Sequence, residues 1–411
     1  MLTPEQQEQF GEIFEELGKS LDITQDQHEA AVKSYEFVGD WLAQEGSTLA
    51  PYQPEILPQG SFLLGTMIKP VHEEDELDID LVCRVIGKRV NWTQYDLKQA
   101  VGNRIKDHGM LLRLLKEEGR RCWTLQYAES ARFHLDILAA LVGRDYKVLL
   151  EKSMSAGDLE EAKGLGIRIT DKEHPMYRSA TDPAYWLMSN PFGYAVWFEQ
   201  RASLALVKAR LLSESVKPVP LYQATKLPLQ RIVQILKRHR DIMFNGDEDK
   251  PISIIITTLA GRAYHKQTNV MKALQEVIDT MHLHIENRYD HLRGKMVKWI
   301  SNPVNEEENF ADKWPDHPAR EQKFFQWLDQ VKADVARLQY QRMTEIQESL
   351  GRSFGKVAVT NAFSSIGERN LLNRQSGGMR MAAGTGMLGS LGRTIVRPHN
   401  NFGGNEDDTV V

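Results

Sequence analysis

The hydrophobic pattern changes near the middle of the chain, and this change limits the folds that the chain can adopt. Before about residue 175, short runs rich in Val, Ile and Leu alternate with polar or Gly-containing turns, which is typical of β-strands. From Tyr194 onward, apolar residues recur at helical spacing over long stretches. The sequence therefore predicts an α+β fold in which a mixed α/β part precedes a helical part.

The expected elements follow from this pattern. Two amphipathic helices open the chain, one after Thr3-Pro4 and one that has Thr24 as its N-cap and ends near Gly46. Four strands are expected in the first part, at 79–85, 121–127, 133–142 and 166–170. Five helices are expected in the second part, at 194–212, 228–244, 252–265, 270–285 and 318–350.

Three domains are predicted. Residues 1–175 form the mixed α/β core with its N-terminal helices, and residues 176–370 form a helical lobe. After about residue 370 the chain is rich in Gly, Ser and Met and poor in large apolar residues, so 371–411 is expected to be a flexible tail. In the favoured alternative, 397–403 docks on the helical lobe through Phe402, which makes the tail only partly flexible.

Charge and cysteine content narrow the class of protein. The 411 residues carry a net charge of -5, which argues against a surface built to hold nucleic acid and favours small substrates. Cys83 and Cys122 are too few for a disulfide framework, and a reducing cytosol is the expected compartment. The N-terminus lacks the pattern of a signal peptide, and no run approaches the roughly 20 apolar residues of a membrane span. We expect a cytoplasmic protein without direct nucleic-acid binding.

Two carboxylates alternate at the start of an apolar strand. Residues two apart on a strand share a face, so Asp78 and Asp80 project together while Ile79 faces the core. Carboxylates side by side repel unless a cation neutralises them, and hard Mg²⁺ or Mn²⁺ ions prefer such oxygen ligands. Asp136 lies in a second apolar strand, where an unpaired carboxylate would be costly. From a neighbouring strand it would complete a metal site.

A Gly-Ser turn precedes this acidic pair. Ser61 stands seventeen residues before Asp78, within Gln59-Gly60-Ser61. Glycine permits close backbone approach, and exposed N–H groups with a hydroxyl can hold a phosphate. A lone Gly-Ser pair is usually only a turn, and the acidic run 73–76 is expected to be solvated. The ordered combination of the turn, the acidic pair and the isolated Asp favours a catalytic site that transfers phosphoryl groups with two metal ions.

His134 admits two interpretations. It lies two residues before Asp136 and therefore on the same face of the strand, where it would be a partner of a metal ligand. A structural histidine with satisfied hydrogen bonds is the favoured interpretation. Cys83 is expected to be a small buried apolar residue.

These motifs resemble a known superfamily. The stretches PQGSFLLGTMIKP…DELDIDLV and FHLDIL resemble the signature and the third-carboxylate strand of polymerase-β-like nucleotidyltransferases. Residues 186–202, 227–244 and 251–264 are similar to the bacterial cGAS/DncV-like nucleotidyltransferases, the CD-NTases of CBASS anti-phage systems. The resemblance implies a two-lobed cage in which a catalytic mixed sheet faces a helical lobe and nucleoside triphosphates bind between them.

The resemblance also implies roles for single residues. Asp78, Asp80 and Asp136 would hold two Mg²⁺ or Mn²⁺ ions. The nucleotide would be bound by Gln59, Gly60, Ser61, Lys237 and Ser253. Alternatives remain for the last two, because the helix of Lys237 also carries Arg238, His239 and Arg240, and Ser253 also fits a helix N-cap.

The implied reaction condenses nucleoside triphosphates, ATP among them, into a cyclic di- or trinucleotide with loss of pyrophosphate. The product would signal in anti-phage defence, with CBASS accessory proteins as partners. Metal-assisted nucleotidyl transfer follows from the residues, whereas closure into a ring follows only from the resemblance. One alternative is a nucleotidyltransferase with another acceptor, namely an RNA 3′ end, an antibiotic or a protein. The other is an inactive nucleic-acid-sensing module of the same fold, against which the three carboxylates count.

Overall fold

The computed structural model describes residues 4–72, 74–127, 132–204, 222–291, 293–341, 343–381, 388–389 and 394–396. Within these residues, no helix is both long and apolar enough to cross a membrane.

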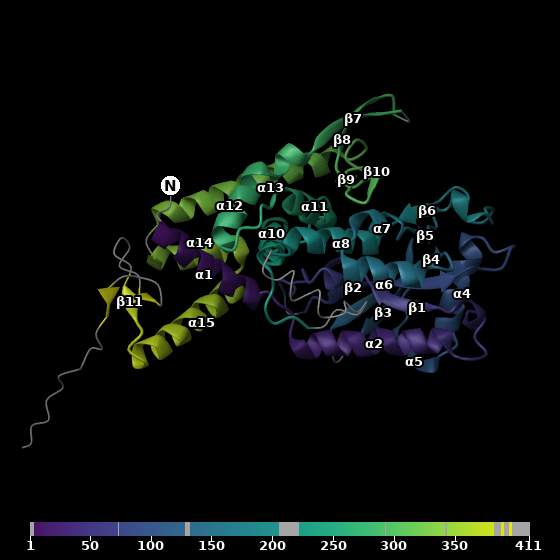
Figure 1. Cartoon of the computed structure of the whole chain (residues 1–411), viewed down its shortest axis with the longest axis horizontal. Coiled ribbons are helices and arrows are strands. Elements are labelled where there is room, and N and C mark those ends of the chain that lie inside the picture. Colours follow the sequence, from purple (N-terminus) through teal and green to yellow (C-terminus); the bar gives the residue numbers. More distant parts are fainter. Residues whose placement is uncertain are drawn as a thin grey trace, which may run out of the picture.

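A six-stranded mixed sheet forms the core of the first part (Figure 1). Its strands are β1 (Glu55–Pro58), β2 (Leu77–Ile86), β3 (Cys122–Tyr127), β4 (Phe133–Val142), β5 (Ile167–Ile169) and β6 (Leu187–Ser189). The main path runs β1-β2-β4-β5-β6, and β3 pairs with β4 beside it. The pair β2–β4 is parallel and the remaining pairs are antiparallel. The mixed sheet and the helical second part confirm the predicted fold class, and all four expected strands form.

Both faces of the sheet are covered, but by different helices. The elements packed around it are α2 (Gln25–Ala43), α3 (Gly60–Leu63), α4 (Gln94–Lys106), α5 (Gly109–Leu114), α6 (Tyr146–Ala156), α7 (Leu159–Lys163) and α8 (Pro191–Ala202). One face of β2, with Leu77, Ile79 and Leu81, packs beneath α2 and α4. Val82 on the other face packs beneath α6 and α8. Because side chains alternate along a strand, Asp78 and Asp80 lie on the Val82 face.

The helical lobe holds the largest apolar cluster. Its helices are α1 (Pro4–Ser20), α10 (Pro228–Phe244), α11 (Ser253–Ala263), α12 (Val270–Thr280), α13 (Pro318–Arg337), α14 (Met343–Phe354) and α15 (Lys356–Gln375). Helix α1 packs in this lobe against α10, α12 and α15, although these helices come much later in the sequence (Figure 1). In contrast, α2 packs on the sheet, with Thr24 as its N-cap in a capping box with Gln27.

Several helices differ from the predicted spans. The predicted helix 194–212 begins earlier, at Pro191 after the N-cap Asn190, and α8 ends at Ala202, where Ser203 becomes extended. Residues 205–221 lie outside the described residues. The predicted helix 318–350 is two helices, because a 3₁₀ turn at Leu338–Tyr340 and an extended Gln341 interrupt it.

Strands in the second part were not predicted. They form two hairpins, β7 (Glu286–Asp290) with β8 (Lys295–Trp299) and β9 (Ser301–Asn302) with β10 (Asn305–Asn309). These strands are largely polar and exposed, so they carry no apolar alternation for a sequence reading to detect. Beyond α15 lie three two-residue strands, β11 (Arg380–Met381), β12 (Leu388–Gly389) and β13 (Thr394–Ile395). The segment 397–403, with Phe402, is outside the described residues.

Candidate active site

The Gly-Ser turn lies against the second carboxylate of the pair. Strand β1 ends at Pro58 opposite Leu81, and the Gln59 amide donates to the Asp80 carbonyl at 2.9 Å. Gly60 has φ +58°, and a Cβ there would lie 2.7 Å from Asp80 Oδ2. Both the left-handed backbone and the close approach therefore require glycine. Ser61 follows in the short helix α3.

The strand register brings the three carboxylates together. In the parallel pair β2–β4, Asp80 lies opposite Asp136 and Asp78 opposite His134. Asp136 comes from the adjacent strand, as predicted, and its Oδ1 accepts a hydrogen bond from Thr124 on β3. Asp78 is exposed, whereas Asp80 and Asp136 are partly buried.

The three carboxylates lie close enough together to repel one another. Burial and the neighbouring charges of Asp78 and Asp136 raise the pKa of Asp80 to about 7, although Lys237 and His134 oppose the shift. A bound cation would relieve this repulsion. The donor set thus fits the divalent ion that the sequence predicts.

His134 contacts a predicted metal ligand, and both of its ring nitrogens have carboxylate partners, so the structural interpretation and the interpretation as a partner of a metal ligand both stay open. Its Nε2 lies 3.1 Å from Asp78 Oδ1, and its Nδ1 lies 3.5 Å from Glu76 Oε2. The hydrogen bond to Asp78 raises the pKa of His134 to about 9, against the effect of burial. Glu76 also accepts a hydrogen bond from Gln126 on β3. It is therefore not a purely solvated member of the acidic run.

One potential ligand atom from each of Asp78, His134 and Asp136 lies within 4.8 Å of the others. Asp80 does not belong to this group, because its carboxylate is turned toward Gly60. Asp78 and Asp136 are thus gathered as predicted, and Asp80 stands beside them.

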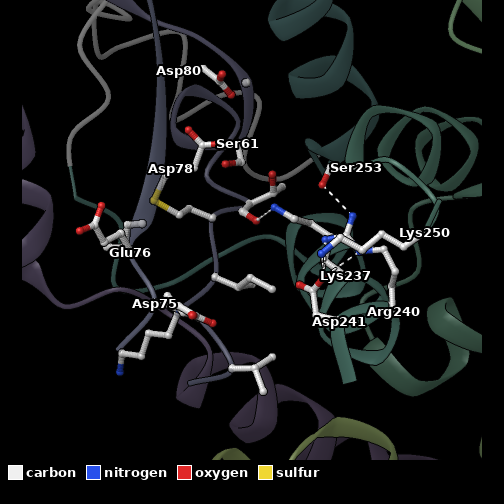
Figure 2. A pocket seen from close by; sticks show the side chains of 18 of the residues that line it. Ser61, Asp75, Glu76, Asp78, Asp80, Lys237, Arg240, Asp241, Lys250 and Ser253 are labelled. Atoms are coloured by element: carbon white, nitrogen blue, oxygen red, sulfur yellow. Dashed lines mark hydrogen bonds and ion pairs between the residues drawn. The ribbon is translucent and has the colours of Figure 1, made fainter. Parts of the chain in front are cut away.

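A cleft of about 690 Å³ separates this group from α10 and α11 (Figure 2). Gly60, Ser61, Asp78, Asp80, Lys237 and Ser253 line it, whereas Gln59 and Asp136 do not. Apart from Lys69 and His72, which lie in the segment before β2, its charges are largely segregated. The wall formed by β2 and the loop before it carries Asp75, Glu76, Asp78 and Asp80. The wall formed by α10, the turn after it and the start of α11 carries Lys237, Arg240 and Lys250, with Asp241.

Lys237 is buried at the centre of the basic wall. It is 6% exposed, and its Nζ donates to the Thr66 carbonyl at 3.0 Å. Burial and the positive charge of the neighbouring Arg240 lower its pKa to about 8. Two of the three competing cations point elsewhere, since Arg238 donates to the Lys69 carbonyl and His239 contacts Asp334, whereas Arg240 shares the wall with Lys237. Lys237 is therefore not part of a solvated basic stripe.

Ser253 is the first residue of α11, and Ile252 occupies the N-cap position. The Ser253 hydroxyl accepts a hydrogen bond from Arg240 Nη1 at 2.9 Å. The same guanidinium binds the Pro251 carbonyl and Asp241. Arg240 thus holds the start of α11 against α10, which places Ser253 on the cleft.

Sequence reasoning gave no role in the site to Asp241 or Lys250, and it named Arg240 only as a cation that competes with Lys237. Arg240 could have been found, because it follows Lys237 by three residues and therefore shares its helix face. Lys250 carries no such signal, since it lies in a polar turn between two helices.

The sheet, the Gly-Ser turn and the neighbouring carboxylates define a nucleotidyltransferase. Residues 54–139 match the family described as "Cyclic GMP-AMP synthase DncV-like, nucleotidyltransferase domain". A c-di-GMP synthase of Roseivirga ehrenbergii is 27% identical over 335 residues, which are 80% of each chain. The cyclic dinucleotide synthase CdnG of Bradyrhizobium diazoefficiens is 24% identical, over 95% of this chain and 94% of that protein.

Comparison with solved structures finds the same fold among CD-NTases. The solved structure of the Bradyrhizobium diazoefficiens CD-NTase CdnG in complex with GTP superposes with a TM-score of 0.64 at 19% identity, covering 87% of this chain and 99% of that one. Residues 54–139 therefore carry a DncV-like nucleotidyltransferase domain, and over most of its length the chain is similar to CD-NTases.

Proposed function

We propose that this nucleotidyltransferase joins nucleoside triphosphates into a cyclic dinucleotide and releases pyrophosphate. The segregated cleft carries the proposal: an acidic wall suited to metal ions faces a basic wall suited to phosphates. A metal-bound triphosphate is a ligand that both walls can hold at once. Cyclic dinucleotide synthesis is supported by the activity for which the two curated relatives are named.

We assign divalent-ion binding to Asp78, Asp80 and Asp136. They lie on adjacent positions of β2 and β4, and their mutual repulsion favours a cation. Two Mg²⁺ or Mn²⁺ ions, when bound, would stabilise the attacking and leaving oxygens of phosphoryl transfer. His134 would orient Asp78 through the hydrogen bond between them.

Phosphate binding is assigned to both walls. On the sheet side, the backbone and hydroxyl at Gly60-Ser61 face the cleft, and Gln59 is proposed as a further contact from the turn. On the helical side, Lys237 and Ser253 face it. In the reaction, a ribose hydroxyl oxygen forms a bond to the α-phosphorus and loses its proton to solvent, the bond from that phosphorus to the bridging oxygen breaks, and pyrophosphate leaves with the negative charge. Lys237 is placed to stabilise this charge.

GTP is the first substrate to test. One relative is named a c-di-GMP synthase, and CdnG has been solved with GTP bound. ATP is proposed as a second substrate from the resemblance to the family. We further propose a cytoplasmic role in anti-phage signalling with CBASS accessory proteins. A phage challenge of cells with and without the active enzyme would test this role.

The decisive experiment incubates the purified protein with Mg²⁺ and GTP, ATP or both, without any other acceptor. After phosphatase treatment, mass spectrometry should find a resistant cyclic dinucleotide. The double variant Asp78→Ala/Asp80→Ala should form none while its melting temperature in metal-free buffer stays level or rises, because two repelling anions are removed. Products that appear only when an RNA, an antibiotic or a protein is added would replace cyclisation by transfer to that acceptor. Unchanged product formation by the double variant would refute the proposed site.

A further inference from the structure

Three cations on the basic wall face the proposed phosphate site, and they differ in how firmly they are held. Arg240 is fully engaged: Nε donates to Asp241 at 2.9 Å, Nη1 to the Pro251 carbonyl and the Ser253 hydroxyl, and Nη2 lies 2.8 Å from Asp241. Its guanidinium therefore cannot move to a ligand without releasing the start of α11.

Lys250 is held differently. Its Nζ lies 3.4 Å from Asp241 Oδ1, at the long end of the range for an ion pair, and that carboxylate already binds Arg240 at shorter distances. The Lys250 side chain is 35% exposed and lines the cleft (Figure 2). The cost of leaving Asp241 is small, because a long, partly exposed ion pair contributes little.

The backbone on either side of Lys250 is anchored. Before it, Asp247 binds Lys323 with both oxygens at 2.7 Å, and Asp249 binds Arg320 at 3.1 Å. After it, the Pro251 carbonyl is held by Arg240 at 3.1 Å. A flexible four-carbon side chain thus extends from a fixed base into the cleft, an arrangement that suits a lysine binding phosphate as a point charge.

We infer that Lys250 leaves Asp241 when substrate binds and holds the terminal phosphate of the nucleoside triphosphate. This inference rests on the proposed function. Lys237, buried on the same wall, serves the part of the phosphate chain nearer the carboxylates. Lys250, on the turn that leads into α11, binds the terminal phosphate of that chain. The enzyme then distinguishes a triphosphate from a diphosphate by a contact that only the triphosphate can make.

The test compares the loss of the lysine with the loss of the terminal phosphate, by measuring two ligands on two proteins. Calorimetry measures the binding of a GTP analogue with a non-hydrolysable α–β linkage, and of GDP, to the wild type and to Lys250→Gln in Mg²⁺ buffer. Lys250→Gln should weaken the triphosphate analogue by about ten- to a hundredfold, as expected for a lost hydrogen bond to a charged group, and GDP by less than about threefold. Melting curves should coincide, because the side chain is partly exposed.

Two matched variants complete the design. Lys69→Gln removes another cation that lines the cleft, and Lys272→Gln removes an exposed charge on α12 outside it. Neither should discriminate between the two ligands. Equal weakening of both ligands by Lys250→Gln, no weakening, or selective loss only in Lys69→Gln would overturn the inference. If the wild type binds neither this analogue nor the corresponding ATP analogue, the proposed function itself fails.

Discussion

At the scale of single residues, Asp78 is oriented by a chain of side chains from three strands and the loop before β2. Gln126 on β3 donates to Glu76, Glu76 faces His134 on β4, and His134 contacts Asp78 on β2. Asp78 is the most exposed of the three carboxylates, so it depends most on such a partner to keep one orientation. Partners of this kind fix the geometry of metal ligands in many proteins.

His134→Ala should therefore weaken divalent-ion binding by about 10- to 100-fold, as is usual when a residue that orients a metal ligand is lost. Mn²⁺ binding followed by electron paramagnetic resonance measures this directly, without turnover. The control is His317→Ala, which removes an exposed histidine at the start of α13. Equal Mn²⁺ affinity in the wild type and His134→Ala would show that Asp78 needs no such support.

At the scale of elements, α10 and Lys226 just before it hold the segment that follows the Gly-Ser turn. Side chains of these residues donate to its backbone carbonyls: Lys226 to Gly65, Gln230 to Leu64, Gln234 to Met67, Lys237 to Thr66 and Arg238 to Lys69. One helix thereby aligns the turn on the sheet side with the basic wall that it carries itself. The two walls of the cleft are positioned by the same element.

Gln234→Leu should break this alignment. Gln234 is fully buried and donates to both the Met67 carbonyl and Asp22, so leucine leaves buried acceptors without a donor, at a cost of about 1–3 kcal/mol. Thermal unfolding should shift downward and nucleotide affinity should fall. Gln330→Leu, on the exposed face of α13, is the control and should leave both unchanged. Wild-type stability of Gln234→Leu would mean that the segment is held by other contacts.

A second element-scale contact joins the end of β5 to the start of β3. Asp171 is buried, which alone would raise its pKa, but hydrogen bonds from Arg120 and Arg121 lower it to about 2. Because the folded pKa lies below the unfolded value of about 3.9, the ionised carboxylate stabilises the fold above pH 4, and this stability is lost as the pH falls toward 2.

Asp171→Asn should accordingly cost about 2–3 kcal/mol at pH 7, and much less near pH 2. Urea unfolding of the wild type and the variant between pH 7 and pH 2 measures the difference. A free-energy difference that did not change with pH would show that the ionised carboxylate is not the source of the stability.

At the scale of the whole molecule, the first two helices of the chain lie in different lobes. Helix α1 buries Phe10, Phe14 and Leu17 in the helical lobe, whereas α2 packs on the sheet. Between them, Asp22 binds Arg231 of α10 at 2.7 Å. The N-terminal residues thus belong to a core most of whose other members lie more than two hundred residues later. The predicted domain boundaries at residues 175 and 370 remain predictions.

Phe14→Ala should destabilise the helical lobe by about 3–5 kcal/mol, because Phe14 is fully buried and its ring contacts Phe354 of α14 at 5.8 Å. Hydrogen exchange should rise in α14 and α15 although the change lies near the N-terminus. Phe37→Ala, which removes a more exposed aromatic from α2, should leave exchange in these helices unaltered. Faster exchange confined to α2 and the sheet would contradict the observed packing of α1.

Sequence by itself determined the features that depend on local periodicity. The alternation of Asp78, Ile79 and Asp80 decided which side chains share a face, and the unbroken helical spacing of 228–244 predicted α10 with its observed bounds. The tertiary structure alone decided which distant pieces meet. It turned His134 toward Asp78, packed α1 with α15, and brought Lys250 into the cleft. Those contacts depend on packing between elements far apart in the chain, and a pattern of neighbouring residues carries no record of it.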